Sequence, residues 1–166
     1  MFEKIVGLVY ILGDDINTDD IVPSSALTLR DTSAVAQYTL KFIDPKFVKK
    51  VSKYNILIAG ENFGTGSSRE EAVNVFKVLG IKCVIARSFA RIYFRNLINL
   101  GIPGIHLNWK PNLLSQDDKL EISLSEGVIF NITKDLKINF EKLPEFLTKI
   151  LEEGGIINQL RKKLLN

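Results

Sequence analysis

Residues 55–86 read NILIAGENFGTGSSREEAVNVFKVLGIKCVIA, and this stretch decides the fold. It holds two short, wholly apolar runs, at 56–59 and 83–86, which are typical of buried strands. A glycine-rich loop follows the first run, and the positions after it carry apolar residues at helical spacing, namely Ala72, Val75, Phe76 and Leu79. Gly80 is placed to end that helix. Strand, helix and strand in this order predict a right-handed parallel crossover and an α/β fold.

The N-terminal region extends the predicted sheet. Residues 4–12 predict a strand, and 13–20 form a polar turn rich in residues that bond their own backbone. A second extended piece is expected from Ile21 to Pro23, and a short helix around 33–40. These elements supply one more strand for the sheet.

The C-terminal half predicts further helices and strands. A helix ends at Gly101, with one face formed by Phe89, Ile92, Tyr93, Asn96, Leu97 and Leu100. Ile105 lies on the next expected strand, and 119–140 alternates and turns like a small antiparallel meander. The tail predicts two helices, one from Pro144 to about Gly154 and one from Ile156.

Composition excludes several classes of function. The chain has 166 residues, 46% of them hydrophobic, which fits one globular domain with its own core. A net charge of +3 without an aromatic-interleaved basic patch predicts no nucleic-acid partner. The first apolar stretch, 5–12, is shorter than the roughly 20 residues that span a bilayer and lacks a signal-peptide plan. We therefore expect no membrane association and a cytoplasmic location.

The metal-binding residue types are scarce. Cys83 is the single cysteine and His106 the single histidine. One cysteine forms no internal disulfide, and an iron–sulfur cluster needs about three or four thiolates. We therefore expect no metal site made by this chain alone.

The loop at 64–69, Gly-Thr-Gly-Ser-Ser-Arg, is the first candidate site. Its two glycines allow positive φ and a close backbone approach to a ligand. It leads into a helix N-terminus, where unpaired N–H groups favour anions, and Arg69 adds a planar fork suited to a carboxylate. A structural interpretation stays open, because Ser68 and Glu71 have the spacing of a capping box.

Two other polar patterns are weaker candidates. Asp14, Asp15, Asp19 and Asp20 crowd the turn at 13–20 and could bind a hard cation, although turn formation is the preferred interpretation. Arg87, Arg91 and Arg95 recur every four residues along an expected helix edge. They indicate a solvated stripe or the footprint of an acidic partner.

Three segments together resemble the small subunits of isopropylmalate dehydratase and homoaconitase, in the aconitase superfamily. They are GDDINTDDIVP at 13–23, AGENFGTGSSRE at 59–70 and VIARSFARIYFRN at 84–96. The tail residues LPEF at 143–146 and EGG at 153–155 also fit. The resemblance covers nearly the whole chain in the right order.

The resemblance implies a fold and a partner. The fold would be an aconitase-type swivelling domain over 1–166, an α/β domain with a mixed, barrel-like sheet and flanking helices. A separate large subunit would hold a 4Fe-4S cluster whose open iron polarises the departing hydroxyl of a small dicarboxylate or tricarboxylate substrate. This chain would bind no cofactor itself and would be an inactive hydro-lyase subunit when alone.

The resemblance also implies roles for single residues. Ser67 matches the catalytic base, and Ser68 and Arg69 match ligands of a substrate carboxylate, with Gly64, Thr65 and Gly66 forming the loop. Thr18 and Asp19 match a Thr-Asp pair at the edge of the site. Two positions depart from the family, Thr65 where Cys is frequent and Glu71 where His is frequent.

Substrate choice depends on the segment after Pro23. Arg30 lies about two residues later than the arginine expected of a homoaconitase. Without a cation there, the pocket suits the apolar branch of isopropylmalate, and we expect leucine biosynthesis. With Arg30 in the site, it suits the extra carboxylate of homoaconitate. A stand-alone anion-binding module without catalysis is the third alternative.

Overall fold

The computed structural model describes residues 3–165, and its centre is a seven-stranded mixed sheet of order β4-β3-β2-β1-β5-β6-β7. Strands β1 to β4 pair in parallel with one another, whereas β5 pairs antiparallel with both β1 and β6, and β6 pairs antiparallel with β7. The strands are β1 Ile5–Ile11, β2 Ile56–Ala59, β3 Cys83–Ala86, β4 Gly104–His106, β5 Lys119–Ser123, β6 Val128–Asn131 and β7 Leu136–Asn139. Strand β1 therefore joins a parallel half to an antiparallel half.

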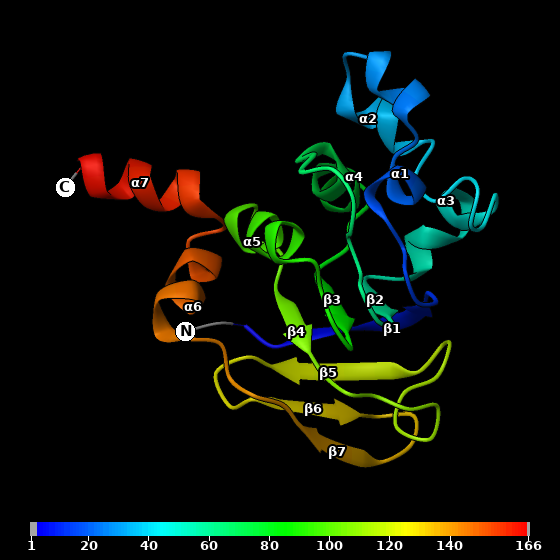
Figure 1. The fold of residues 1–166 in the computed structure, drawn as a ribbon. Helices are drawn as coiled ribbons and strands as arrows, with labels where there is room; N and C mark the ends of the chain where they lie inside the picture. The colour runs from blue at the N-terminus through cyan, green and yellow to red at the C-terminus, as the bar shows by residue number, and fades with distance from the viewer. Residues whose placement is uncertain (1–2, 166) are drawn as a thin grey trace.

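Helices cover one face of the parallel half (Figure 1). The helices of the described chain are α1 Thr18–Ile21, η1 Ser24–Thr28, α2 Thr32–Ala36, α3 Phe47–Lys50, η2 Val51–Lys53, α4 Glu71–Val78, α5 Arg91–Asn99, α6 Glu145–Glu152 and α7 Ile156–Leu165. The antiparallel strands lie on the opposite side, and α7 projects away from the body of the molecule (Figure 1). Within residues 3–165, no helix has the length and apolar character needed to cross a membrane.

Both faces of the parallel strands are buried, as their unbroken apolar runs predict. In β2, Leu57 and Ala59 belong to the cluster beneath the helices, whereas Ile56 and Ile58 belong to a second cluster. The second cluster also contains Ile122 from β5 and residues of β6 and β7. The sheet thus curls into a half-barrel around this second core.

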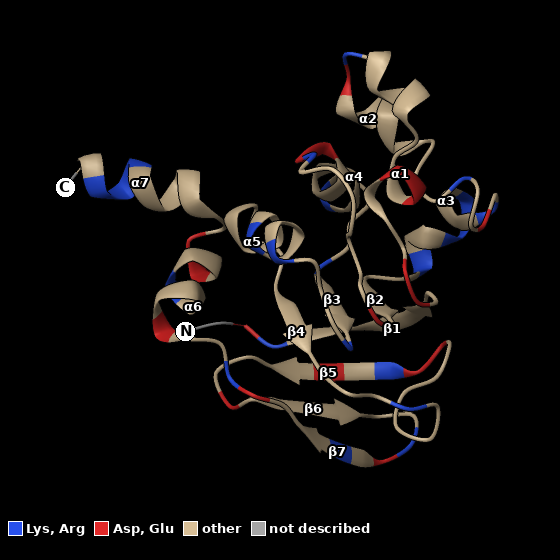
Figure 2. Ribbon diagram, viewed as in Figure 1, with Lys and Arg blue, Asp and Glu red and all other residues tan. Residues whose placement is uncertain are grey.

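Lysine and arginine are spread over separate elements. Figure 2 shows them on α3, α5 and α7, with acidic residues on α1 and at the ends of the antiparallel strands. No described element combines these basic residues into one long stripe, because Arg87 precedes α5 and only Arg91 and Arg95 lie on it.

Three sequence-based expectations need correction. Ile21 does not begin an extended piece. It ends α1, and a 3-10 turn follows Pro23, because the fully buried Ile21 side chain anchors α1 to the core. Ile92 does not share the buried face of α5, since it is 54% exposed whereas Tyr93, Leu97 and Ile98 are buried. The helix expected around 33–40 is also shorter and is followed by turns.

Candidate functional site

The site is built where the parallel strands β1 and β2 end. These strands are direct neighbours, so their carboxyl ends meet at one edge of the sheet. The segments that follow them pair like a short continuation of the sheet. The Gly64 N–H donates to the Ile16 carbonyl at 2.8 Å, and the Thr18 N–H donates to the Thr65 carbonyl at 2.8 Å. The turn at 13–20 and the loop at 64–69 are thus held together by backbone bonds.

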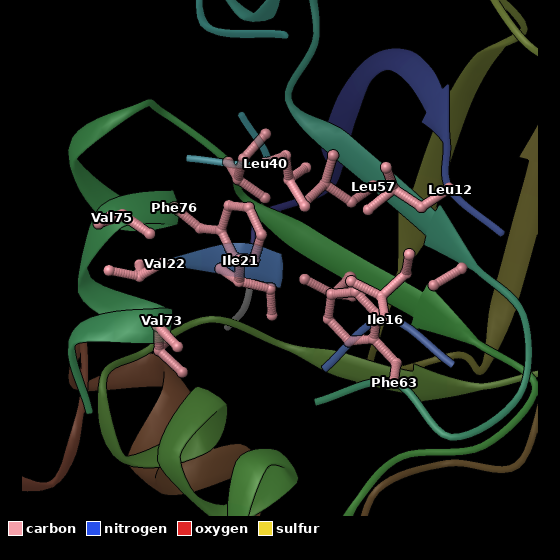
Figure 3. Packing of buried hydrophobic residues seen from close by; sticks show 14 of the residues in the cluster. Leu12, Ile16, Ile21, Val22, Leu40, Leu57, Phe63, Val73, Val75 and Phe76 are labelled. Atoms are coloured by element: carbon pink, nitrogen blue, oxygen red, sulfur yellow. The ribbon is translucent and has the colours of Figure 1, made fainter. Parts of the chain in front are cut away.

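The segment after β3 completes the framework. The Asn62 N–H donates to Ser88 Oγ at 2.7 Å, and the Ala90 N–H donates to the Phe63 carbonyl at 2.9 Å. Below these loops, Ile16 and Phe63 pack in the cluster shown in Figure 3. The three segments quoted for the resemblance therefore form one structure, anchored by apolar side chains.

Gly64 is required where the loop crosses α5. Its φ is +82°, and a Cβ atom there would lie 2.1 Å from Cγ of Tyr93. Tyr93 is buried and its hydroxyl donates to the Ala72 carbonyl at 2.8 Å, so it has no freedom to move. A side chain at Gly64 would displace the loop that carries Ser67.

Ser67 is exposed and contacts Thr18. Its backbone N–H donates to Thr18 Oγ1 at 3.1 Å, and the two hydroxyl oxygens lie 3.3 Å apart. Thr18 is only 1% exposed. The arrangement places an accessible serine hydroxyl directly above a buried threonine hydroxyl.

Arg69 lies beside the acidic end of α1. Its Nη1 is 2.7 Å from Oδ1 of Asp19, and its Nη2 donates to Ser24 Oγ at 3.3 Å. The Ser24 hydroxyl in turn donates to Asp19 at 3.2 Å. One guanidinium nitrogen thus faces the Asp19 carboxylate and the other faces the Ser24 hydroxyl, so Arg69 already contacts one anionic group at this site.

The predicted capping role of Ser68 is wrong. Helix α4 begins at Glu71 with Glu70 as its N-cap, and no side chain caps it. Ser68 instead lies exposed in the preceding loop. Within residues 3–165, the backbone N–H groups of Ser68, Arg69 and Glu70 have no acceptor. They are free to bind a ligand anion.

A capping box exists at α1 instead. The Asp20 N–H donates to Asn17 Oδ1 at 2.8 Å, and the Asn17 N–H donates to Asp20 Oδ2 at 3.0 Å. This box fixes the start of the helix that carries Thr18 and Asp19. The Asn-x-x-Asp spacing was visible in the sequence, but the crowd of aspartates around it indicated only a turn.

The four aspartates of the turn do not converge on one point. Asp14 accepts from the Glu61 N–H at 2.8 Å, and Asp15 accepts from Asn62 Nδ2 at 2.8 Å. Asp19 pairs with Arg69, and Asp20 belongs to the capping box. The described residues contain no group of three or more His, Cys, Asp and Glu suited to a metal ion. The turn interpretation is the one the contacts support.

The predicted arginine stripe is also wrong at one position. Arg87 lies 4.6 Å from the ring centroid of Trp109, and its Nε donates to the Trp109 carbonyl at 3.0 Å. It is therefore a packed residue that secures the segment after β4. Arg91 and Arg95 remain exposed on α5.

Cys83 and His106 lie apart from the loop site. Cys83 is fully buried in β3, and burial raises the pKa of its thiol. It is therefore not available as a thiolate ligand of a cluster. His106 is at the end of β4 between the rings of Phe89 and Phe94, at 4.9 and 5.0 Å, and burial lowers the pKa of the imidazole.

Arg30 makes no hydrogen bond or ion pair with the loop site within residues 3–165. It is exposed just before α2, and within residues 3–165 it makes no ion pair. Asp31, its neighbour, caps α2 by accepting from the Ala34 N–H at 3.3 Å. Asp31 therefore does not pair with Arg30, and the guanidinium has no partner among the described residues.

The loop site is an open surface. A groove of about 580 Å³ lies between α5 and α6, and it is lined by Phe89, Arg91, Phe94, Arg95, Ile98, Asn99, His106, Phe146, Leu147 and Ile150. Thr18, Ser67 and Arg69 do not line it. A reacting group placed at Ser67 would therefore need a second surface to exclude water.

Comparison with known proteins places this arrangement in a family. The model of the aconitase C-terminal domain matches residues 15–109, more than half of the chain. The chain is 44% identical to 3-isopropylmalate dehydratase small subunit 1 of Thermotoga maritima, over 94% of each chain. The chain belongs to the family of 3-isopropylmalate dehydratase small subunits. The resemblance inferred from the three segments is confirmed.

Further members of this family support the assignment. The chain is 43% identical to the 3-isopropylmalate dehydratase small subunit of Clostridioides difficile, over 93% of this chain and 95% of the other. It is 42% identical to the isopropylmalate/citramalate isomerase small subunit of Methanocaldococcus jannaschii, over 96% and 95%. A crystal structure of 3-isopropylmalate dehydratase from that archaeon has a TM-score of 0.91 and 40% identity, over 98% and 96%. The predicted mixed, barrel-like α/β fold is thereby confirmed.

Proposed function

We propose that this small subunit supplies the proton-transferring and carboxylate-binding half of a 3-isopropylmalate dehydratase site. The observation that carries the proposal is the meeting of Ser67, Arg69, Asp19 and Thr18 on one open edge, from two segments far apart in the sequence. The other half of the site would come from a large subunit. The open surface around Ser67 supports a site completed by a second protein.

Ser67 is the proposed base. As an alkoxide, its Oγ would accept the proton from the carbon next to a substrate carboxylate. The electron pair of that C–H bond would form the C=C bond as the hydroxyl leaves the neighbouring carbon as hydroxide. Rehydration would then place hydroxide on the carbon that lost the proton and a proton on its neighbour, which gives the isomer. A free serine is a weak base, so donors near Oγ must stabilise the alkoxide.

Ser68 and Arg69 are the proposed ligands of the substrate carboxylate. The unpaired N–H groups of Ser68, Arg69 and Glu70 and the Arg69 fork form a set of donors on one loop. Asp19 holds the Arg69 fork while substrate is absent. On binding, a substrate carboxylate would compete with Asp19 and Ser24 for the two guanidinium nitrogens.

The large subunit is the proposed holder of a 4Fe-4S cluster, which would supply Lewis-acid chemistry toward the leaving hydroxyl. Cys83 is buried and alone, so this chain does not supply the cluster ligands. The proposed substrate is a small dicarboxylate with an apolar branch, and the proposed location is the cytoplasm.

Reconstitution tests the proposal. The purified chain is combined with a 3-isopropylmalate dehydratase large subunit under anaerobic conditions, and formation of the unsaturated intermediate from isopropylmalate is followed by absorbance. Each subunit alone is expected to be inactive, and the mixture active. Turnover by the large subunit alone, equal to that of the mixture, would remove the proposed contribution of this chain.

A serine exchange tests the base. Ser67→Ala is expected to lower kcat by at least about a hundredfold, the usual range for loss of a positioned base. The matched control is Ser52→Ala, an exposed serine in η2 on another part of the surface. Retention of more than about a tenth of wild-type kcat by Ser67→Ala would contradict the base role.

A further inference from the structure

Thr18 has a hydroxyl that is buried yet directed at the proposed base. The residue is 1% exposed, and its Oγ1 lies 3.3 Å from Ser67 Oγ. The same Oγ1 accepts the Ser67 backbone N–H at 3.1 Å. A residue so enclosed is poorly placed to touch a substrate, so its contact with Ser67 calls for a separate explanation.

The direction of the hydroxyl–hydroxyl bond follows from accounting for donors. A threonine hydroxyl has one hydrogen to donate, and a buried donor left unpaired is costly. Within residues 3–165, Ser67 Oγ is the only acceptor within hydrogen-bond distance of the Thr18 hydroxyl. Thr18 therefore donates to Ser67 Oγ, and the hydrogen of Ser67 itself is left pointing elsewhere.

The surrounding backbone holds Thr18 in this position. Its N–H donates to the Thr65 carbonyl at 2.8 Å, and its carbonyl accepts the Val22 N–H at 2.9 Å. The Asn17–Asp20 capping box fixes the first turn of α1. The oxygen that contacts Ser67 is thus carried by a backbone that is bonded on both sides.

Gly66 leaves room for the Thr18 hydroxyl. Its φ is +105°, and a Cβ atom there would lie 2.9 Å from Thr18 Oγ1. A side chain at Gly66 would push against the same oxygen that donates to Ser67. The second glycine of the loop is therefore explained by Thr18, as Gly64 is explained by Tyr93.

We propose that Thr18 is a positioning residue that stabilises the deprotonated form of Ser67, rather than a ligand of the substrate. When Ser67 loses its proton, the Thr18 bond becomes charge-assisted and stronger than the neutral bond. The Thr18 hydroxyl would therefore stabilise the alkoxide of Ser67 more than its neutral hydroxyl. This inference rests on the proposed role of Ser67 as the base.

The test compares Thr18→Val with Thr18→Ser in the reconstituted enzyme. Valine keeps the shape and removes the donor, whereas serine keeps the donor and removes the methyl group. Thr18→Val is expected to lower kcat about thirtyfold with KM changed less than about twofold, since the bond strengthens only with the alkoxide. In the pH–rate profile of Thr18→Val, the limb that reports the base is expected to move to higher pH by about one unit or more. Thr18→Ser is expected to stay within about threefold of wild type.

The double variant Ser67→Ala/Thr18→Val separates a role through Ser67 from a structural role. If Thr18 acts through Ser67, the double variant is expected to be no slower than Ser67→Ala alone. Wild-type kcat and pH profile in Thr18→Val would overturn the inference, as would equal losses in Thr18→Val and Thr18→Ser. Either result would overturn the role of Thr18 alone if Ser67→Ala is inactive. If Ser67→Ala is active, both the role of Thr18 and the proposed role of Ser67 as the base are overturned.

Discussion

The two halves of the sheet use polar side chains in opposite ways. In the parallel half, Ser67 and Ser68 lie exposed on a loop, and neither serine is enclosed by the protein. In the antiparallel half, Asp118 is 3% exposed and Asn131 is 0% exposed, and both are bonded inside the core. Asn131 Nδ2 donates to Asp118 at 2.7 Å, and Lys134 Nζ lies 3.1 Å from the same carboxylate.

A structural polar group and a ligand-binding polar group therefore differ in where their hydrogen-bond partners come from. A buried group must find its partners within the chain, because an unpaired group costs free energy. An exposed group next to free N–H groups has its partners supplied by a ligand. The parallel half gains this freedom because loops follow its strands at one edge. In the antiparallel half, short hairpin turns connect the strands, so no set of loops gathers at one edge of the sheet.

The largest expected effect concerns the buried carboxylate of the antiparallel half. Asp118→Ala leaves Lys134 and Asn131 without a shared acceptor, and we expect a loss of about 3 kcal/mol in the free energy of unfolding. Urea unfolding of the isolated chain measures it. The control is Glu126→Ala, an exposed carboxylate in the same half, for which we expect a change within about 0.5 kcal/mol. Equal free energies of unfolding for the two variants would contradict the structural role assigned to the buried carboxylate.

The second effect concerns Arg69, the half-buried arginine at the candidate site in the parallel half. Arg69→Lys keeps the charge but loses the planar fork, and we expect kcat/KM to fall by about 10- to 100-fold. The stability of the isolated chain should change little, since a partly exposed ion pair with Asp19 contributes at most about 1 kcal/mol. Steady-state kinetics on the reconstituted enzyme measures the effect. An unchanged kcat/KM would show that Arg69 does not bind substrate.

A third prediction tests whether a polar side chain has a structural role because it is buried, whichever half of the sheet it lies in. Tyr10 on β1 is buried, and its hydroxyl donates to Asp44, which also accepts from Lys50. The Tyr10 hydrogen bond lowers the pKa of Asp44 to about 2. Tyr10→Phe should therefore cost about 1.5 kcal/mol of stability near neutral pH and leave kcat unchanged.

The pH dependence of this cost has a definite sign. A carboxyl whose folded pKa is depressed contributes stability above its unfolded pKa, near 4, and loses it as the pH falls toward 2. The stability difference between wild type and Tyr10→Phe should thus be constant from about pH 5 to 7 and shrink below pH 4. Urea unfolding at several pH values measures it. A difference that grows on acidification would contradict this assignment.

The smallest effect concerns Arg30, the proposed selector of the substrate branch. Because Arg30 is exposed and unpaired in the described chain, Arg30→Ala should change kcat/KM for isopropylmalate by less than about twofold. If Arg30 binds the extra carboxylate of homoaconitate, the activity of Arg30→Ala on homoaconitate should fall at least about tenfold. Arg161→Ala on α7 is the control. Equal small effects on both substrates would leave the apolar Leu27 and Leu29 as the selecting side chains.

Much of the fold could be predicted from residue patterns. The strands at 56–59 and 83–86 and the meander after residue 119 lie where periodicity placed them, because an apolar run between polar turns has few other conformations that bury it. The same patterns did not predict that Ile92 is exposed. The face of α5 that packs against neighbouring elements is narrower than the apolar face expected from its sequence.

The choice of residues for the candidate site stays a prediction, and some of the contacts expected around them were wrong. Ser67, Arg69 and Asp19 were selected from motif and resemblance, and they lie on one surface. The capping of α4 by Ser68 was wrong, because the backbone of the loop runs on to Glu71 before the helix begins. Arg87 was assigned to a solvent-facing stripe, but Trp109, far along the sequence, covers it.

The sequence by itself determined the family, the order of the elements and the residue types at the candidate site. These depend on local pattern and on motifs that are continuous in the chain. Only the tertiary structure decided that Thr18 lies under Ser67 and that Asp19 occupies the Arg69 fork. Those contacts join residues about 50 positions apart. They exist because β1 and β2 pair in parallel and bring the ends of both strands to one edge.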